Sequence, residues 1–208
     1  MNPAAVLQAT VEDFLEALSH TPDAALAELV NCILRACGCN HTLDADEVAD
    51  LDNAPSKLDD IIEAMKQDEA TVYPLTSKLP AFKPFRSSLS EFVSRLISSA
   101  AAMGQLYTSD LVITVETWIT TMSSSQLRSF RHTATVVAMD ILTALSDVAA
   151  SVEKESEVLS RQKEGERRRK KGRGEPATAR EKELESKADE VRERRTKLKE
   201  HLNEFFNE

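Results

Sequence analysis

The fold of this protein is decided by residues 126–171, which read QLRSFRHTATVVAMDILTALSDVAASVEKESEVLSRQKEGERRRKK. Apolar side chains recur here at intervals of three and four residues, from Phe130 to Leu159. This near-heptad spacing predicts one long helix with a single apolar seam, about 65–70 Å long at 1.5 Å per residue. The seam consists of Phe130, Ala134, Val137, Ile141, Leu145, Val148, Val152, Glu155 and Leu159.

A second seam of the same kind follows a turn rich in glycine and proline at residues 172–176. It consists of Leu184, Ala188, Val191, Arg195, Leu198, Leu202 and Phe205. Two long helices joined by a turn predict an antiparallel coiled-coil hairpin, in which the numbers of facing residues sum to a constant. A constant of 350 pairs the apolar positions with one another and Glu155 with Arg195, and opposite charges at matched positions would fix the register.

The composition predicts an all-α protein. The chain has 208 residues, 41% of them hydrophobic, with only five glycines and seven prolines, whereas sheets and hairpins need more turn glycines. No apolar run approaches the roughly 18 residues of a membrane span, and no signal peptide is recognisable, so we expect no membrane contact. Three cysteines are too few for a disulfide framework and indicate a reducing compartment.

Charge divides the chain sharply, although the net charge is −9. Residues 1–77 hold 15 acids and three bases, whereas residues 161–173 hold eight bases and two acids. Proline and charge together predict four segments. These are an acidic N-terminal helical region (1–72), a proline-containing linker loop (73–84), a helix pair (85–124) and the long hairpin (125–208) with a basic tip at about 161–182.

Local signals place the shorter helices. Thr21-Pro22 is typical of a helix start, Gly38 of a helix end, and Asp44 and Ser56 of caps for helices at 44–51 and 57–70. Three prolines between 74 and 84 forbid a helix there. Beyond this loop, the apolar spacing predicts helices at 85–103 and 111–122, which we expect to form an antiparallel pair.

No motif for catalysis is present. The sequence lacks GxxxxGK[ST], GxGxxG, GxSxG and HExxH, so we expect no enzyme, no cofactor and no small-molecule substrate. Cys32, Cys37, Cys39 and His41 could in principle hold zinc, but their spacing is not that of a structural zinc site, and buried cysteines at a helix end are the favoured interpretation. His132 is interpreted as a satisfied core or interface histidine rather than a general base.

Two groups of bases are candidates for phosphate contact. Lys78, Lys83 and Arg86 lie in the proline-rich loop and at the helix start that follows it. The second group lies at the hairpin tip and comprises Arg167, Arg168, Arg169, Lys170 and Lys171. The alternative for both groups is a solvated charged face, and for the tip also a nuclear-import signal.

Residues 123–139, SSSQLRSFRHTATVVAM, are similar to the pattern Q-x-R-x-F-R-H-T-x-T-x-x-A-M of the stromalin (STAG, or stromal-antigen) family, the large helical-repeat subunit of cohesin. Tyr73-Pro74-Leu75 resembles the family's Y-P-L, and residues 82–87, FKPFRS, resemble its W-K-K-F-R-S. The resemblance covers about residues 71–150 and continues into the charged hairpin. Residues 34–39 are compatible with fungal members.

The resemblance implies an α-solenoid of HEAT-like helix pairs and a chromosome-associated, nuclear protein. It implies binding to the kleisin and to other cohesin or cohesin-loader subunits, and sequence-independent contact with double-stranded DNA during sister-chromatid cohesion and chromosome segregation. The family's basic patch carries over to Lys83 and Arg86, with Pro84 in place of its second lysine.

Arg128 and Arg131 also match family positions, with capping of the repeat as the structural alternative. Family members are several times longer, so we expect an N-terminal piece. The rival interpretation is a nuclear protein-interaction scaffold without DNA contact.

Overall fold

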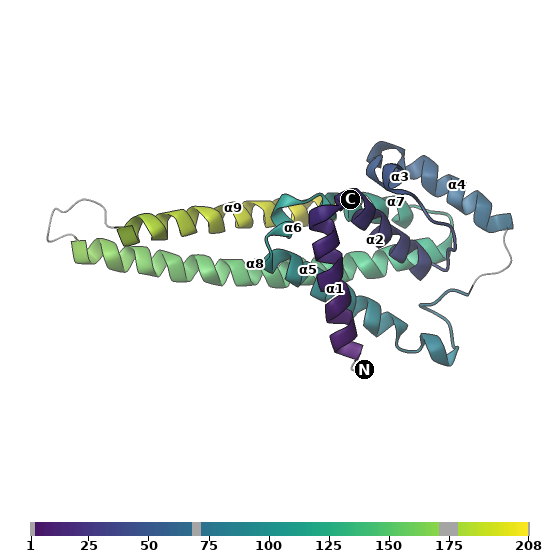
Figure 1. Cartoon of the computed structure of the whole chain (residues 1–208), viewed down its shortest axis with the longest axis horizontal. Coiled ribbons are helices and arrows are strands. Elements are labelled where there is room, and N and C mark those ends of the chain that lie inside the picture. Colours follow the sequence, from purple (N-terminus) through teal and green to yellow (C-terminus); the bar gives the residue numbers. More distant parts are fainter. Residues whose placement is uncertain (1–2, 68–71, 171–178, 208) are drawn as a thin grey trace. The chain divides into compact units, whose positions relative to one another are not determined.

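The computed structural model describes residues 3–67, 72–170 and 179–207, and within these ranges the chain forms helices and no strand. Two compact units can be distinguished, residues 1–144 (unit 1) and residues 145–207 (unit 2). The boundary falls inside one helix, α8 (Arg128–Lys170) (Figure 1).

The first two helices begin and end where local chemistry demands it. α1 (Pro3–His20) is followed by α2 (Pro22–Ala36), which has Pro22 in its first turn as predicted. Gly38 ends α2 with φ +83°, while the N–H of Cys39 donates to the Leu34 carbonyl at 3.1 Å. A Cβ at Gly38 would also lie 3.0 Å from the Val72 carbonyl oxygen, so both the conformation and the space require glycine.

Short helical turns continue the acidic region. Asp44 caps α3 (Ala45–Ala49) in a complete capping box with Glu47, as its sequence position predicts. A 3₁₀ turn, η1 (Leu51–Asn53), then leads directly into α4 (Ala54–Gln67). The prediction of Ser56 as the cap of this helix was therefore wrong. The 3₁₀ turn ends at Asn53, and α4 begins at Ala54, two residues before Ser56. The predicted last residues of this helix, 68–70, lie outside the described ranges.

The acidic helices pack on the helices that follow the loop. These are η2 (Pro80–Phe82), α5 (Phe85–Ala102), the single turn α6 (Gln105–Thr108) and α7 (Leu111–Ser123). α1 packs against α5, whereas α2 and α4 pack against α7. The two predicted helices at 85–103 and 111–122 exist, and each packs against helices of the acidic region. That region is part of unit 1.

The core of unit 1 is aliphatic with two large aromatic side chains. Trp118 and Phe130 are fully buried, and the indole Nε1 of Trp118 donates to the Val48 carbonyl at 3.3 Å. Asn31, also buried, donates to and accepts from the backbone of Leu43 at 2.8 Å each, which fixes the segment after α2. Every buried polar group named here is satisfied, as a close-packed interior requires.

Within the part of the chain that the structure describes, α8 contains a stretch that is long and apolar enough, by length and composition, to cross a membrane. The expectation that no segment approaches this length is corrected accordingly. Several of its apolar side chains nevertheless belong to the core, since Phe130, Ala134 and Val137 are buried in unit 1, whereas Met139 is exposed. Asp140, in the middle of the stretch, accepts a hydrogen bond from Ser90 of α5 at 2.6 Å.

Unit 2 is the predicted antiparallel hairpin, formed by the second half of α8 and by α9 (Ala179–Asn207), which run side by side in opposite directions (Figure 1). Its seam is apolar, and the buried members are Leu145, Val152, Leu159, Leu184, Val191 and Leu198.

The ion pair that Glu155 forms across the hairpin differs from the prediction by one residue. Glu155 binds Arg194 at 3.4 Å, and Arg195 instead binds Glu153 at 2.9 Å. The Arg194 side chain is 26% exposed and that of Arg195 60%, so Arg194 occupies the seam.

Candidate nucleic-acid interface

The loop before α5 carries three of the candidate cations. Two turns order its first part, in which the N–H groups of Thr76 and Ser77 donate to the carbonyls of Tyr73 and Pro74 at 3.4 Å. Prolines prevent this segment from becoming helical until residue 85. Lys78, Lys83 and Arg86 consequently remain exposed on the loop and on the first turn of α5.

Tyr73 fastens this loop to α8. Its hydroxyl shares a hydrogen bond with His132 Nδ1 at 2.8 Å and another with Thr133 Oγ1 at 3.1 Å. The tyrosine and histidine rings also meet edge to face, with centroids 6.0 Å apart. The two motifs that carry the family resemblance, Tyr-Pro-Leu and Phe-Arg-His-Thr, are therefore in direct contact, and His132 is a satisfied interface histidine as expected.

Burial raises the pKa of the Tyr73 hydroxyl, the hydrogen bond to Thr133 lowers it, and the charges of Arg128 and Arg86 lower it further. Both guanidinium groups therefore lie close enough to influence one phenol, although they are 42 residues apart in sequence. Charges at the start of α5 and at the start of α8 therefore both act on this tyrosine.

The start of α8 contributes the other two unit 1 candidates. Arg131 donates from Nη1 to the carbonyls of Ser125 at 2.6 Å and Gln126 at 2.8 Å, which ties down the segment that enters the helix. This contact is the capping role that the sequence offered as the alternative for Arg131. Arg128 is exposed, one turn before His132.

Five of the ten predicted residues thus lie in unit 1, on two segments joined by Tyr73, and the charges of two of them, Arg86 and Arg128, both act on this tyrosine. In the described ranges none of Lys78, Lys83, Arg86, Arg128 and Arg131 forms an ion pair with a carboxylate. Unpaired, exposed cations at two helix starts are chemically suited to hold phosphate oxygens. We refer to these five residues as the loop patch.

The remaining predicted residues belong to unit 2. Arg167 and Arg168 are exposed, and Arg168 pairs with Glu164 one turn earlier. Nearby, Glu166 pairs with Arg180 of α9 at 3.5 Å. The side chains of Arg169 and Lys170, and the whole of Lys171, lie outside the described residues.

The cysteines do not assemble into a metal site. Cys37 and Cys39 are buried, whereas Cys32 lies on an exposed face of α2. The Cys37 thiol donates to the Ile33 carbonyl at 3.3 Å. Burial raises the pKa of this thiol to about 12, although the hydrogen bond with Thr133 partly lowers the pKa. Within the described ranges no three His, Cys, Asp or Glu side chains are grouped as metal ligands.

The sequence did not predict that Tyr73 contacts α8. Its motif was noticed, but its partners lie 59 and 60 residues away. Only the joint presence of Tyr73 and His132 in two family-like motifs could have signalled the pairing.

A helical unit built on such packing, followed by a long helical hairpin, defines an all-α protein of the helical-solenoid class. In agreement, the structure of cohesin subunit Scc3 from Z. rouxii (residues 88–1035) matches 97% of this chain and 23% of its own with a TM-score of 0.84, at 22% sequence identity. The STAG domain matches residues 71–187. The chain belongs to the STAG family.

Curated relatives agree with this assignment. Cohesin subunit psc3 of Schizosaccharomyces pombe is 32% identical over 88% of this chain. Cohesin subunit SA-1 of Xenopus laevis is 33% identical over 89%, and cohesin subunit SA-3 of Homo sapiens is 30% identical over 96%. The chain spans 19%, 15% and 16% of the lengths of these three relatives.

Proposed function

We propose that this chain is part of a non-catalytic cohesin subunit that contacts double-stranded DNA without reading its sequence. The observation that supports DNA contact is the exposure of all five cations of the loop patch, two of which, Arg86 and Arg128, act on the same tyrosine, Tyr73. The cohesin role is supported by relatives of 30–33% identity that are named cohesin subunits. With this role come the kleisin and the other cohesin or loader subunits as partners, and a place on chromosomes in the nucleus.

The physical mechanism is electrostatic. Lysine and arginine side chains displace counterions from DNA phosphates. At about 0.15 M salt and above, where only the nearest charges act, the logarithm of the binding constant therefore falls linearly with the logarithm of salt concentration. The first turn of α5 adds backbone N–H groups, because Pro84 supplies no side-chain cap. Such contacts position a duplex and give no base preference.

Charge reversal of Lys83 and Arg86 tests this proposal. K83E/R86E should weaken binding to a short duplex at least about ten-fold, and should reduce the salt slope by about 2 because each lost phosphate contact accounts for about 0.9. Fluorescence anisotropy titrations at several salt concentrations measure both quantities. K57E/K66E, which changes the net charge equally on α4, should leave the slope unchanged at about 0.15 M salt and above, where charges away from the loop patch are screened. An unaltered slope in K83E/R86E would refute the loop patch as the DNA contact.

The hairpin tip is the second proposed contact. R167E/R168E asks whether unit 2 contributes, and Arg169, Lys170 and Lys171 extend the proposal beyond the described residues. A change of slope in this variant alone would move the DNA contact from the loop patch to the hairpin.

The second candidate function is a protein-interaction scaffold. The specific observation in its favour is an open apolar groove between α1, α2 and α5, lined by three phenylalanines. A gel shift with the whole chain separates the two functions, because a scaffold without DNA contact gives no shifted band at low or at moderate salt.

A further inference from the structure

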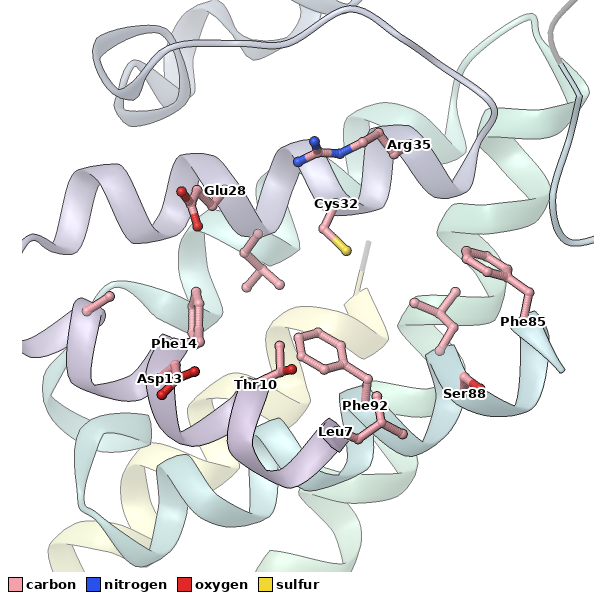
Figure 2. Close-up of a pocket in the computed structure, with 13 residues that line it drawn as sticks. Leu7, Thr10, Asp13, Phe14, Glu28, Cys32, Arg35, Phe85, Ser88 and Phe92 are labelled. Carbon is pink, nitrogen blue, oxygen red and sulfur yellow. The ribbon is translucent and has the colours of Figure 1, made fainter. Parts of the chain in front are cut away.

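An apolar groove crosses unit 1 between α2 on one side and α1 and α5 on the other (Figure 2). It has a volume of about 530 Å³, and Phe14, Phe85 and Phe92 line it, each only partly buried. Three of the seven phenylalanines of the chain therefore face one opening. Apolar surface that remains open in this way usually marks a binding groove.

The groove continues beyond this cavity. A second cavity of about 700 Å³ shares Cys32, Arg35 and Phe85 with the first and extends to Phe82 and Pro74 of the loop before α5. Phe82 and Phe85 meet edge to face, with centroids 6.3 Å apart. The two cavities therefore adjoin along α2 and the start of α5.

Charge gives the groove a direction. Asp13 of α1 and Glu28 of α2 flank one end. The backbone of Arg35 lies further along α2, and its exposed side chain is turned back along the helix (Figure 2). Glu28 and Arg35 are seven residues apart, which is about 10 Å along a helix axis, or two turns. In the described part of the chain none of the three forms an ion pair, and Arg35 uses only its Nε, which donates to the Asn31 carbonyl at 3.2 Å.

We propose that this groove binds an amphipathic helix of a partner protein, oriented antiparallel to α2. The first turn of the partner helix carries acidic side chains, which pair with Arg35, and its last turn carries basic side chains, which pair with Asp13 and Glu28. Large apolar side chains between them fill the space bounded by the phenylalanines. The inference does not depend on DNA binding.

The orientation follows from electrostatics. A helix is stabilised by acids in its first turn and bases in its last turn, because these oppose its macrodipole. In the antiparallel orientation the same side chains also meet their opposite charges in the groove. A parallel helix with this charge pattern would place its bases beside Arg35, so like charges across the interface would select against it.

Two designed peptides test the proposal. Both have about 15 residues and the same apolar side chains at i, i+3, i+4 and i+7, so both present one apolar face. One carries glutamates in its first turn and lysines in its last, and the other has these charges exchanged. Fluorescence anisotropy with the whole chain should give a dissociation constant at least about ten-fold lower for the first peptide.

A charge swap in the protein provides the matched control. D13K/E28K/R35E exchanges the charges of the groove at exposed positions and should reverse the preference between the two peptides. E16K changes the net charge by the same amount outside the groove and should leave the preference intact. Equal binding of both peptides, binding of neither, or an unreversed preference in the triple variant would each overturn the proposal.

Cys32 supplies an independent readout. Its thiol points into the groove (Figure 2), where burial raises the pKa of the thiol, while Arg35 lowers it. Because Cys37 and Cys39 are buried, a maleimide at about pH 9 should modify Cys32 first. The first peptide should slow this reaction and the second should not.

Sedimentation of the chain alone tests whether a second copy of the chain, and not a partner helix, fills the groove. The chain should remain monomeric, whereas a dimer that D13K/E28K/R35E abolishes would overturn the assignment to a partner helix.

Discussion

Thr133 is the residue at which three segments of unit 1 meet. It is fully buried, and its hydroxyl contacts both the Tyr73 hydroxyl of the loop and the Cys37 thiol at the end of α2. A threonine in a helix interior usually bonds only to the preceding turn. Here its hydroxyl serves tertiary contacts, which explains why the polar side chain is tolerated in the core.

The buried thiol of Cys37 makes stability depend on pH at the alkaline end. Burial raises its pKa from the ordinary 9.0 to about 12, so the folded chain retains a proton that the unfolded chain releases first. The stabilisation is complete below about pH 9 and is lost as the pH rises towards 12. Urea unfolding should therefore show a free energy of unfolding that falls more steeply between about pH 9 and 11 in the wild type than in C37A.

The alanine variant lowers stability at every pH by leaving a small cavity, and this offset does not affect the comparison of slopes. Equal slopes in the two proteins would show that Cys37 is not the titrating group.

At the scale of elements, the loop at 72–84 is held by few contacts, and the Tyr73 hydroxyl provides two of them. Y73F removes both hydrogen bonds and leaves the Thr133 hydroxyl partly unsatisfied, so unfolding should become easier by about 1–2 kcal/mol. Hydrogen exchange should accelerate in residues 75–84 more than in α7. DNA affinity should also fall, although every cation of the loop patch remains.

A second variant separates this effect from a general loss of stability. T143V removes a local bond from Thr143 Oγ1 to the Met139 carbonyl on an exposed face of α8, and should leave the loop and DNA binding unchanged. If Y73F exchanged in the loop at the wild-type rate, the anchoring role would be refuted.

The elements that could be predicted from the sequence are those with local determinants. The Asp44 capping box, Pro22 in the first turn of α2 and the positive φ of Gly38 each depend on residues within one or two turns. The antiparallel hairpin followed from seam periodicity in the same way. The start of α4 was missed because a 3₁₀ turn precedes it.

The partner of Glu155 was missed by one residue for a related reason. Intervals of three and four alternate along a seam, and the sequence alone does not decide whether Arg194 or Arg195 continues it. The contact of Glu155 with Arg194 decides it. Exposure of the loop cations was predictable from proline and charge, but their convergence was not, because it requires the contact between Tyr73 and His132.

At the scale of the whole molecule, charge is distributed unevenly. Residues 1–144 carry 19 acids and nine bases, whereas residues 145–208 carry 16 acids and 17 bases. The loop patch therefore lies in the acidic unit, among charges that repel DNA. A duplex is attracted by the loop patch and repelled by the net negative charge of unit 1. Which of the two dominates depends on the range of the electrostatic interaction.

This balance predicts a maximum in the dependence of DNA affinity on salt. At about 0.01 M salt the Debye length is about 30 Å, twice the radius of gyration of about 15 Å expected for 144 residues, so DNA is repelled by the whole of unit 1. At about 0.15 M it is about 8 Å, and only the loop patch acts on the phosphates. Affinity should therefore first rise with salt and then fall as counterion release weakens.

Anisotropy titrations from about 0.01 to 0.3 M salt measure this curve, a range over which the screening length shortens several-fold. D52N/D59N/D60N removes three exposed acids from unit 1 outside the loop patch, and should move the maximum to lower salt while raising affinity there. K83E/R86E should lower the whole curve instead. A wild-type affinity that falls steadily from the lowest salt would mean that DNA meets a surface of the chain distant from the acidic helices, and the loop patch would then be the wrong interface.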